Sequence, residues 1–160
     1  MPDPAAFDAF HPFIKGVFSQ WHPTPFNLTG EWFVTAEQWM MVAKARLFDD
    51  LAMAAAIMAT PDPAEQKRLG AQVSGFNHDV WMQHRVSIVH DGNRAKFEQN
   101  PGALRQLSQT APAMLVEANP RDWNWGNGLQ VDDPANHSPS EWRGANLLGR
   151  ILTKVREDLR

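Results

Sequence analysis

Residues 115–128 read Leu-Val-Glu-Ala-Asn-Pro-Arg-Asp-Trp-Asn-Trp-Gly-Asn-Gly and join an apolar segment to a loop rich in functional side chains. Leu115 and Val116 are predicted to form a short buried strand, which Asn119-Pro120 ends. Tryptophan is costly to expose, so Trp123 and Trp125 either close a core or form the wall of a pocket for a flat ligand. The loop setting favours the pocket, because the glycines allow backbone amides to approach a bound group.

The sequence on both sides of this stretch predicts a mainly α fold, a compact single helical domain with a few short β-strands. Helix caps and apolar periodicity carry this prediction: Thr35 with Gln38 forms a capping-box pattern, and Ser138 with Glu141 forms another. Helices are expected over residues 36–47, 51–59, 63–70, 78–98 (with Gly92 weakening its middle), 101–107 and 146–159, and a short strand over 31–34. The domain is expected to span residues 1–160 and to begin with an irregular N-terminal arm over residues 1–16.

Composition sets limits on the class of protein. The chain has 160 residues, of which 43% are hydrophobic and 21% charged, the balance of one globular domain without a membrane span. The absence of cysteine and of a signal peptide makes the cytoplasm the expected compartment. A net charge of −3 gives no general attraction to nucleic acid. The histidines lack paired metal-ligand spacing, so no metal site is expected.

The predicted helix over residues 36–47 brings a carboxylate and an amine to one side. Glu37 and Lys44 lie about two helical turns apart, near methionines of the same face. Such spacing most often describes a solvated pair that flanks core methionines. His84 falls on an apolar stripe of the helix over residues 78–98, and we interpret it as a packing histidine rather than a ligand or a base.

Several familiar active sites are excluded by their missing motifs. The chain has no P-loop, no dinucleotide-binding glycine fingerprint and no nucleophile elbow. The carboxylates, the helical lysine and the tryptophans that remain suit cleavage of a glycosidic bond to a flat base. The oxocarbenium-like centre of that reaction needs nearby negative charge, and its water or leaving group needs a proton acceptor or donor.

Short sequence words from Val17 to Leu159 follow one another in an order that is specific when taken together. They are Phe18-Ser19 with Pro23 and Phe26, Thr35-Ala36-Glu37 with Met40-Met41 and Lys44-Ala45, Trp81, Lys96-Phe97-Glu98-Gln99-Asn100-Pro101, Leu115-Val116-Glu117-Ala118, Asp122 with Trp125-Gly126-Asn127-Gly128, Trp142, Gly144, Asn146-Leu147-Leu148-Gly149 and Val155-Arg156. By these words the chain resembles the NADAR, or YbiA-like, family. The resemblance implies a mostly helical domain that hydrolyses N-glycosidic bonds in ribose-phosphate compounds, with no cofactor.

The resemblance also implies the residues of the site. The expected catalytic residues are Glu37, Lys44 and Asp122. The expected substrate-binding residues are Ser19, Trp81, Lys96, Trp125, Gly126, Gly128 and Asn146. Trp81 or Trp125 would stack on the base, an interaction worth roughly 1–3 kcal/mol in comparable cases. Glu37, Lys44, Asp122 and Trp125 are expected to converge on one pocket despite their separation in sequence.

Lys44 has two alternative roles. It could stay charged and hold the ribose phosphate, or its neutral amine could attack the anomeric carbon and form a Schiff base with the opened sugar, a route that the resemblance suggests. In the second role, Glu37 or Asp122 would move protons and stabilise the developing positive charge. The resemblance slightly favours the covalent role.

Three functions follow from the resemblance. The leading one is hydrolysis of phosphoribosylamino-pyrimidine intermediates of riboflavin synthesis, which releases ribose 5-phosphate and serves metabolite repair. The second is removal of ADP-ribose from guanine in nucleic acid, which the acidic net charge disfavours. The third is a non-catalytic module that binds ADP-ribose or a related nucleotide, and the presence of Glu37, Lys44 and Asp122 argues against it.

Two departures from the family pattern fall in the entry region. Gln20-Trp21-His22 stands where the family often has Asn-Phe-Tyr, and Glu37-Gln38-Trp39 where it often has Glu-His-Tyr. These changes affect the expected pocket shape and its hydrogen bonds to substrate more than the reaction class.

Overall fold

Helices supply most of the regular structure, as the sequence predicts. The computed structural model describes residues 1–160, which form six α-helices, four short strands and three 3-10 helices. The mainly α fold with a few short strands is therefore confirmed. The chain divides into two compact units, residues 20–100 and residues 1–19 with 101–160. No helix combines the length and the apolar character that a membrane crossing requires.

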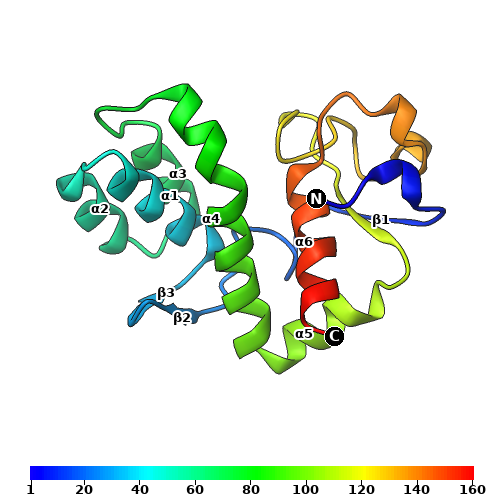
Figure 1. The fold of residues 1–160 in the computed structure, drawn as a ribbon, viewed down its shortest axis with the longest axis horizontal. Coiled ribbons are helices and arrows are strands. Elements are labelled where there is room, and N and C mark those ends of the chain that lie inside the picture. The colour runs from blue at the N-terminus through cyan, green and yellow to red at the C-terminus, as the bar shows by residue number, and fades with distance from the viewer. The chain divides into compact units, whose positions relative to one another are not determined.

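The unit of residues 20–100 is a cluster of helices with one β-hairpin. Helix α1 (Ala36–Leu47) contacts α2 (Leu51–Met58), α3 (Pro63–Gly70) and the long α4 (His78–Gln99), as Figure 1 shows. The hairpin pairs β2 (Phe26–Leu28) with β3 (Glu31–Phe33) in antiparallel register, which confirms the expected strand. The core of this unit consists of fully or almost fully buried apolar side chains, among them Phe26, Phe33, Val42, Ala45, Ile57 and Phe97.

Side-chain caps fix where α1 begins and how it meets α2. Thr35 Oγ1 accepts a hydrogen bond from the Gln38 amide at 3.0 Å, the N-cap that the sequence predicts. Gln38 Oε1 accepts from the Val34 amide at 2.8 Å, one residue before the amide that a capping box would use. Gln38 Nε2 donates to the Ile57 carbonyl at 3.1 Å and so ties the start of α1 to the end of α2.

The other unit is built around a parallel pair of strands and two helices. Strand β1 (Phe10–Phe13) pairs with β4 (Met114–Glu117), and α6 (Leu147–Asp158) contacts β4 and α5 (Pro101–Gln109). The expectation that the whole arm over residues 1–16 is irregular is therefore wrong for β1. The Ala9 and Phe13 carbonyls accept hydrogen bonds from the Met114 and Ala118 amides at 2.9 and 2.8 Å, a pairing between segments far apart in sequence.

Three local expectations need correction. Helix α6 begins at Leu147, because Asn146 has a left-handed backbone with φ 50°. Ser138 makes no side-chain cap, so the 3-10 turn η3 (Pro139–Glu141) lacks the expected capping box. The side chain of His84 is exposed, and its Nδ1 lies 2.8 Å from the Val80 carbonyl oxygen, because only the second half of α4 carries buried residues.

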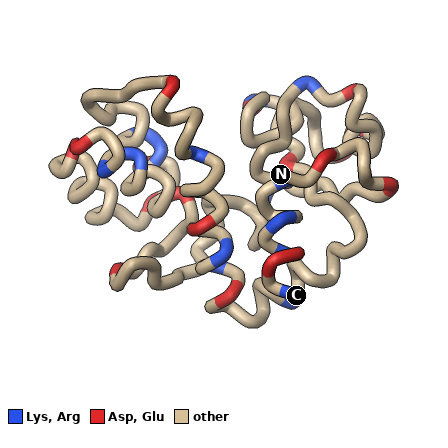
Figure 2. Tube along the Cα trace, in the orientation of Figure 1, with Lys and Arg blue, Asp and Glu red and all other residues tan.

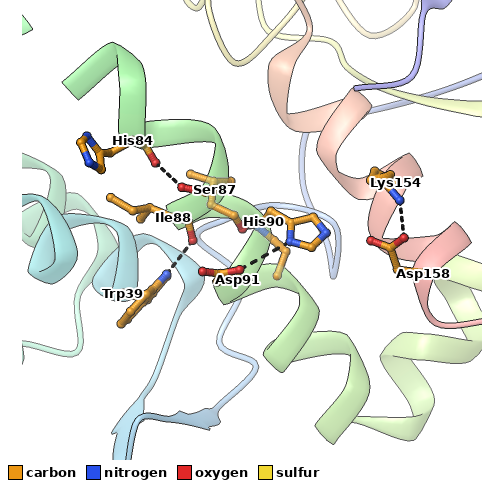
Figure 3. Close-up of polar contacts among 10 residues, drawn as sticks. Trp39, His84, Ser87, Ile88, His90, Asp91, Lys154 and Asp158 are labelled. Carbon is orange, nitrogen blue, oxygen red and sulfur yellow. Dashed lines mark hydrogen bonds and ion pairs between the residues drawn. The ribbon is translucent and has the colours of Figure 1, made fainter. Parts of the chain in front are cut away.

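Gly92 does not weaken the middle of α4, which is continuous through it. A Cβ at this position would lie 2.2 Å from Trp39 Cδ1, so glycine leaves the space that the indole of α1 occupies. Trp39 Nε1 donates to the Ile88 carbonyl at 2.7 Å (Figure 3). Gly92 therefore serves close packing of α1 on α4.

We expect Gly92→Ala to lower the free energy of unfolding by about 1–3 kcal/mol, because the added methyl displaces Trp39 and breaks its hydrogen bond. The control is Gly102→Ala in α5, where the nearest atom to an added Cβ is Arg105 Nη2 at 3.9 Å, so that the better helix propensity of alanine should be neutral or stabilising. Urea unfolding of the full chain measures both. Equal effects of the two substitutions would contradict the packing role.

Candidate functional site

Lys44 lies among aromatic rings in the unit of residues 20–100. Its half-buried ammonium group is 4.8 Å from the ring centroid of Phe76 and 5.6 Å from that of Trp81. The Nζ atom also donates to the Gly70 carbonyl at 2.9 Å, at the end of α3. The amine is therefore held by one carbonyl and two aromatic faces, a partly desolvated setting.

Two opposing effects act on the pKa of Lys44. Burial lowers it, and the negative charge of Glu37 raises it to a smaller extent, so that the pKa lies below its ordinary value. Glu37 itself is only 4% exposed and stands in the first turn of α1. Near neutral pH a larger fraction of Lys44 is thus uncharged than for a solvated lysine, which favours a nucleophilic amine.

A hydrogen-bonded loop before α4 places the aromatic rings on Lys44. Asp50 caps α2 through Met53 and also accepts from the backbone and side chain of Ser74 at 2.9 and 3.0 Å. Gly75 turns the chain with φ 74°, a left-handed conformation that favours glycine. Asn77 Oδ1 accepts from the Val80 amide at 3.0 Å and caps α4, whose first turn carries Trp81.

Phe76 is a candidate site residue that the sequence interpretation missed. It is 46% exposed, and its ring meets that of Phe48 edge-on at 5.4 Å between centroids. The only sequence signal was an aromatic residue between a turn glycine and a helix cap, Gly75 and Asn77. That signal does not reveal that the ring lies over Lys44, because this contact joins residues on different elements.

Lys96 is the second unusual amine of this unit. It stands in the last turn of α4, is completely buried, and burial lowers its pKa to about 7. Its charge also contributes, after burial, to lowering the pKa of His22. Lys96 has no exposed surface through which it could meet a substrate. The expected contact of Lys96 with substrate therefore stays a prediction.

Asp122 and Trp125 lie on a tightly hydrogen-bonded loop in the other unit. Asp122 Oδ1 accepts from the Asn124 and Trp125 amides, both at 2.9 Å, which makes this oxygen part of the turn. A Cβ on Gly126 would lie 2.8 Å from the Asp122 carbonyl oxygen, and Gly128 has φ 79°. Both glycines are thus needed for the shape of the loop, and their contact with substrate stays a prediction.

The same loop closes the start of α6. The carbonyls of Asn124 and Trp125 accept from the Leu147 and Leu148 amides at 3.1 and 3.0 Å, in place of a side-chain cap. Asn146 Oδ1 accepts from the Glu117 amide at 2.9 Å, and its Nδ2 donates to the Leu115 carbonyl at 3.0 Å. The amide of Asn146 therefore binds β4, and a contact with substrate would be additional to this structural role.

The remaining expected residues of this unit differ in exposure. Trp123 is 57% exposed, whereas Trp125 and Ser19 are partly buried. Trp123 therefore does not close a core. The Ser19 amide donates to the Gly16 carbonyl at 2.9 Å, in a turn that follows β1.

The structure brings the expected residues together as two sets. Glu37, Lys44 and Trp81 gather in residues 20–100, and Asp122, Trp125, Gly126, Gly128 and Asn146 share the loop and the start of α6. That both sets act on one substrate stays a prediction. Residues of both charge signs occur along α4 and α6 (Figure 2), so neither helix is uniformly basic.

Comparison with known proteins places these residues in a family. Residues 9–160 match the NADAR domain, a range that includes segments of both units. The chain belongs to the NADAR domain family. This range contains every expected site residue from Ser19 to Asn146. The family includes N-glycosidases, which are hydrolases that act on N-glycosyl compounds.

Individual members of the NADAR domain family are similar over most of the chain. An N-glycosidase of Acanthamoeba polyphaga mimivirus is 43% identical over 147 residues, which are 89% of this chain and 86% of the viral protein. The NMR structure of the Escherichia coli protein YbiA matches with a TM-score of 0.77 and 28% identity, over 95% of this chain and 85% of that chain. A riboflavin biosynthesis protein of Vibrio vulnificus is 28% identical over 90% of this chain, which spans 35% of that protein.

We expect the buried Lys96 to make stability depend on pH. Its pKa is about 7 in the folded chain and has the ordinary value of 10.5 when unfolded, so between these values the unfolded chain binds more protons and stability rises with pH. Lys96→Met should therefore be stabilising at pH 6, and its advantage should shrink by up to about 1.4 kcal/mol per pH unit above neutrality. Urea unfolding from pH 6 to pH 9 measures this difference.

The control for Lys96 is Lys67→Met, since Lys67 is exposed on α3. The free energy of unfolding of this variant should follow the wild type at every pH. A difference between Lys96→Met and the wild type that stays constant across the pH range would show that Lys96 keeps its ordinary pKa.

Proposed function

We propose that the chain is an N-glycosidase that hydrolyses phosphoribosylamino-pyrimidine intermediates of riboflavin synthesis and releases ribose 5-phosphate, as metabolite repair in the cytoplasm. The observation that carries the proposal is Lys44, an amine with a lowered pKa beside the Glu37 carboxylate and two aromatic rings. The names of its relatives, N-glycosidase and riboflavin biosynthesis protein, support this substrate class.

In the proposed reaction the neutral Lys44 amine attacks the anomeric carbon of the substrate. As the Nζ–carbon bond forms, the bond from that carbon to the base nitrogen breaks, and a carboxylic acid delivers a proton to the leaving nitrogen. Nζ then gives one proton to a carboxylate, and the bond from the anomeric carbon to the ring oxygen breaks as that oxygen takes up a proton. The opened sugar stays joined to Nζ through the anomeric carbon as an iminium ion. Water adds to this carbon and the Nζ–carbon bond breaks, so one water is consumed and the free amine returns.

Glu37 is the proposed proton carrier for these steps, together with Asp122. The carboxylate of Glu37 acts on Lys44 by coulombic attraction, so it also stabilises the positive charge that develops on the iminium nitrogen. Asp122 keeps one oxygen in its turn, which leaves Oδ2 as the atom for proton transfer. Its participation with Glu37 in one reaction is part of the proposal.

The alternative role of Lys44 is electrostatic. The Gly70 carbonyl and the faces of Phe76 and Trp81 all stabilise a charged ammonium, which could hold the phosphate of the ribose while water attacks directly. The lowered pKa supports the covalent role instead, since burial outweighs the attraction of Glu37. Trapping separates the two roles.

Incubation of the purified protein with a phosphoribosylamino-pyrimidine, and in parallel with ADP-ribosylated guanine in DNA, tests the substrate class. We expect chromatography to show release of the pyrimidine and of ribose 5-phosphate from the first substrate. Faster release of ADP-ribose from the second would replace this proposal by nucleic-acid repair. Binding of either substrate without any release would identify a non-catalytic binding module.

Borohydride added during turnover tests the covalent role. We expect reduction of the iminium to fix the sugar on Lys44, detected as a mass increase on the peptide that contains it. Lys44→Ala should lose both the adduct and the activity, whereas Lys67→Ala, an exposed lysine of the same unit, should keep both. Full activity of Lys44→Ala would show that Lys44 takes no part in catalysis. If Lys44→Ala is inactive but borohydride traps no adduct on the wild type, the electrostatic role is the one that stands.

Trp81→Ala tests the aromatic contact with the base. We expect the variant to lose about 1–3 kcal/mol of substrate binding, seen as a raised KM, with a smaller loss of folding stability, because Trp81 is only partly buried. Phe76→Ala should act in the same direction. The control is Trp32→Ala, since Trp32 is 65% exposed on the hairpin. A fall in melting temperature without a change in KM would assign Trp81 to packing alone.

A further inference from the structure

Two buried amides, Gln20 and Asn93, link α4 to the segment before the hairpin. Asn93 Nδ2 donates to Gln20 Oε1 at 2.8 Å and to the Val89 carbonyl at 2.9 Å. Asn93 is completely buried and Gln20 is 9% exposed. Neither residue has a role in the site described above, and Gln20 is one of the departures from the usual family pattern.

The orientation of the Asn93 amide is fixed by its partners. The Val89 carbonyl can only accept, so the group that faces it must be the NH2 of Asn93. This orientation leaves Asn93 Oδ1 buried without a hydrogen-bond partner. A buried acceptor without a donor is costly, and a leucine of similar size would avoid the cost. Packing alone therefore does not explain the asparagine, whereas its contact with Gln20 does.

Gln20 connects this amide pair to the proposed proton carrier. The backbone carbonyl of Gln20 accepts a hydrogen bond from the backbone amide of Glu37 at 3.0 Å. The first amides of a helix have no partner within the helix, so this contact caps the turn of α1 that carries Glu37. A shift of Gln20 would thus move the backbone from which the Glu37 carboxylate projects.

We propose that the Gln20–Asn93 amide pair is a positioning device for Glu37. Asn93 fixes the side chain of Gln20 by a hydrogen bond, and the backbone carbonyl of Gln20 fixes the backbone amide of Glu37. The inference rests on the proposed function, in which Glu37 moves protons. The lengths of the two side chains are matched, because an asparagine at position 20 would be one methylene shorter and would not reach Asn93.

Single and paired substitutions test the device through kinetics rather than stability alone. We expect Asn93→Leu and Gln20→Met to lower kcat on the order of 10- to 100-fold, with KM nearly unchanged, because they displace a proton carrier and not a binding group. The acid limb of the kcat–pH profile should shift in both variants. The exchange Gln20→Asn with Asn93→Gln should restore kcat relative to either single exchange, since it keeps the combined length of the pair.

Gln99→Met is the matched control. Gln99 is another amide of α4, and it bonds to the backbone of Asn27 in the hairpin at 2.8 and 2.7 Å without contact to Glu37. Its kcat and pH profile should equal those of the wild type. The inference is overturned if the Asn93→Leu variant is folded at the assay temperature and has the same kcat and the same acid limb of the kcat–pH profile as the wild type.

Glu37→Gln separates the inference from the proposed function. An inactive Glu37→Gln together with a fully active Asn93→Leu would reject the positioning device and leave the proposed function standing. A fully active Glu37→Gln would reject the role of Glu37 itself. Loss of activity in Glu37→Gln and a selective fall of kcat in Asn93→Leu support both.

Discussion

The structure depends on the need to satisfy the free backbone amides at the start of each helix. In residues 20–100, side chains meet this need: Thr35, Asp50, Asp62 and Asn77 each accept from an amide of the helix that follows. At α6 the carbonyls of Asn124 and Trp125 take the same part. Several candidate site residues stand at or beside these helix starts, so the caps that define the helices also place Glu37, Trp81 and the loop of Asp122.

Burial of charge is the second theme of this fold. Lys44 and Lys96 both have lowered pKa values because their amines are removed from water, Lys44 partly and Lys96 fully. Stability alone would favour apolar side chains at such positions, since an amine with a lowered pKa costs free energy below its ordinary pKa. Lys44, which lies beside Glu37 and the aromatic rings, is the amine to which we assign the role of neutral nucleophile in the proposed reaction. Groups with strongly shifted pKa values are more common at functional sites than elsewhere in proteins.

The residues that the chain shares with the NADAR domain family differ in kind from the residues in which it departs from the usual family pattern. The shared sequence words contain the carboxylates, the lysine and the tryptophans to which we assign the proposed reaction. The departures change Gln20 and Gln38, two amides that join elements. Gln20 pairs with Asn93, and Gln38 ties α1 to the end of α2. Both amides act on how α1 is held, and the residues to which we assign catalysis are unchanged.

The sequence by itself determined the starts of α1 to α5 and the family resemblance, because caps act over two or three residues and the motif words are local. It also identified Glu37 and Lys44 as neighbours on one face of α1, since helical periodicity fixes that relation. Only the tertiary structure decided that β1 pairs with β4, that Gly92 makes room for Trp39, and that Phe76 lies over Lys44. It also decided how far Lys44 and Lys96 are buried. Each of these depends on contacts between residues far apart in the chain, for which local propensity carries no signal.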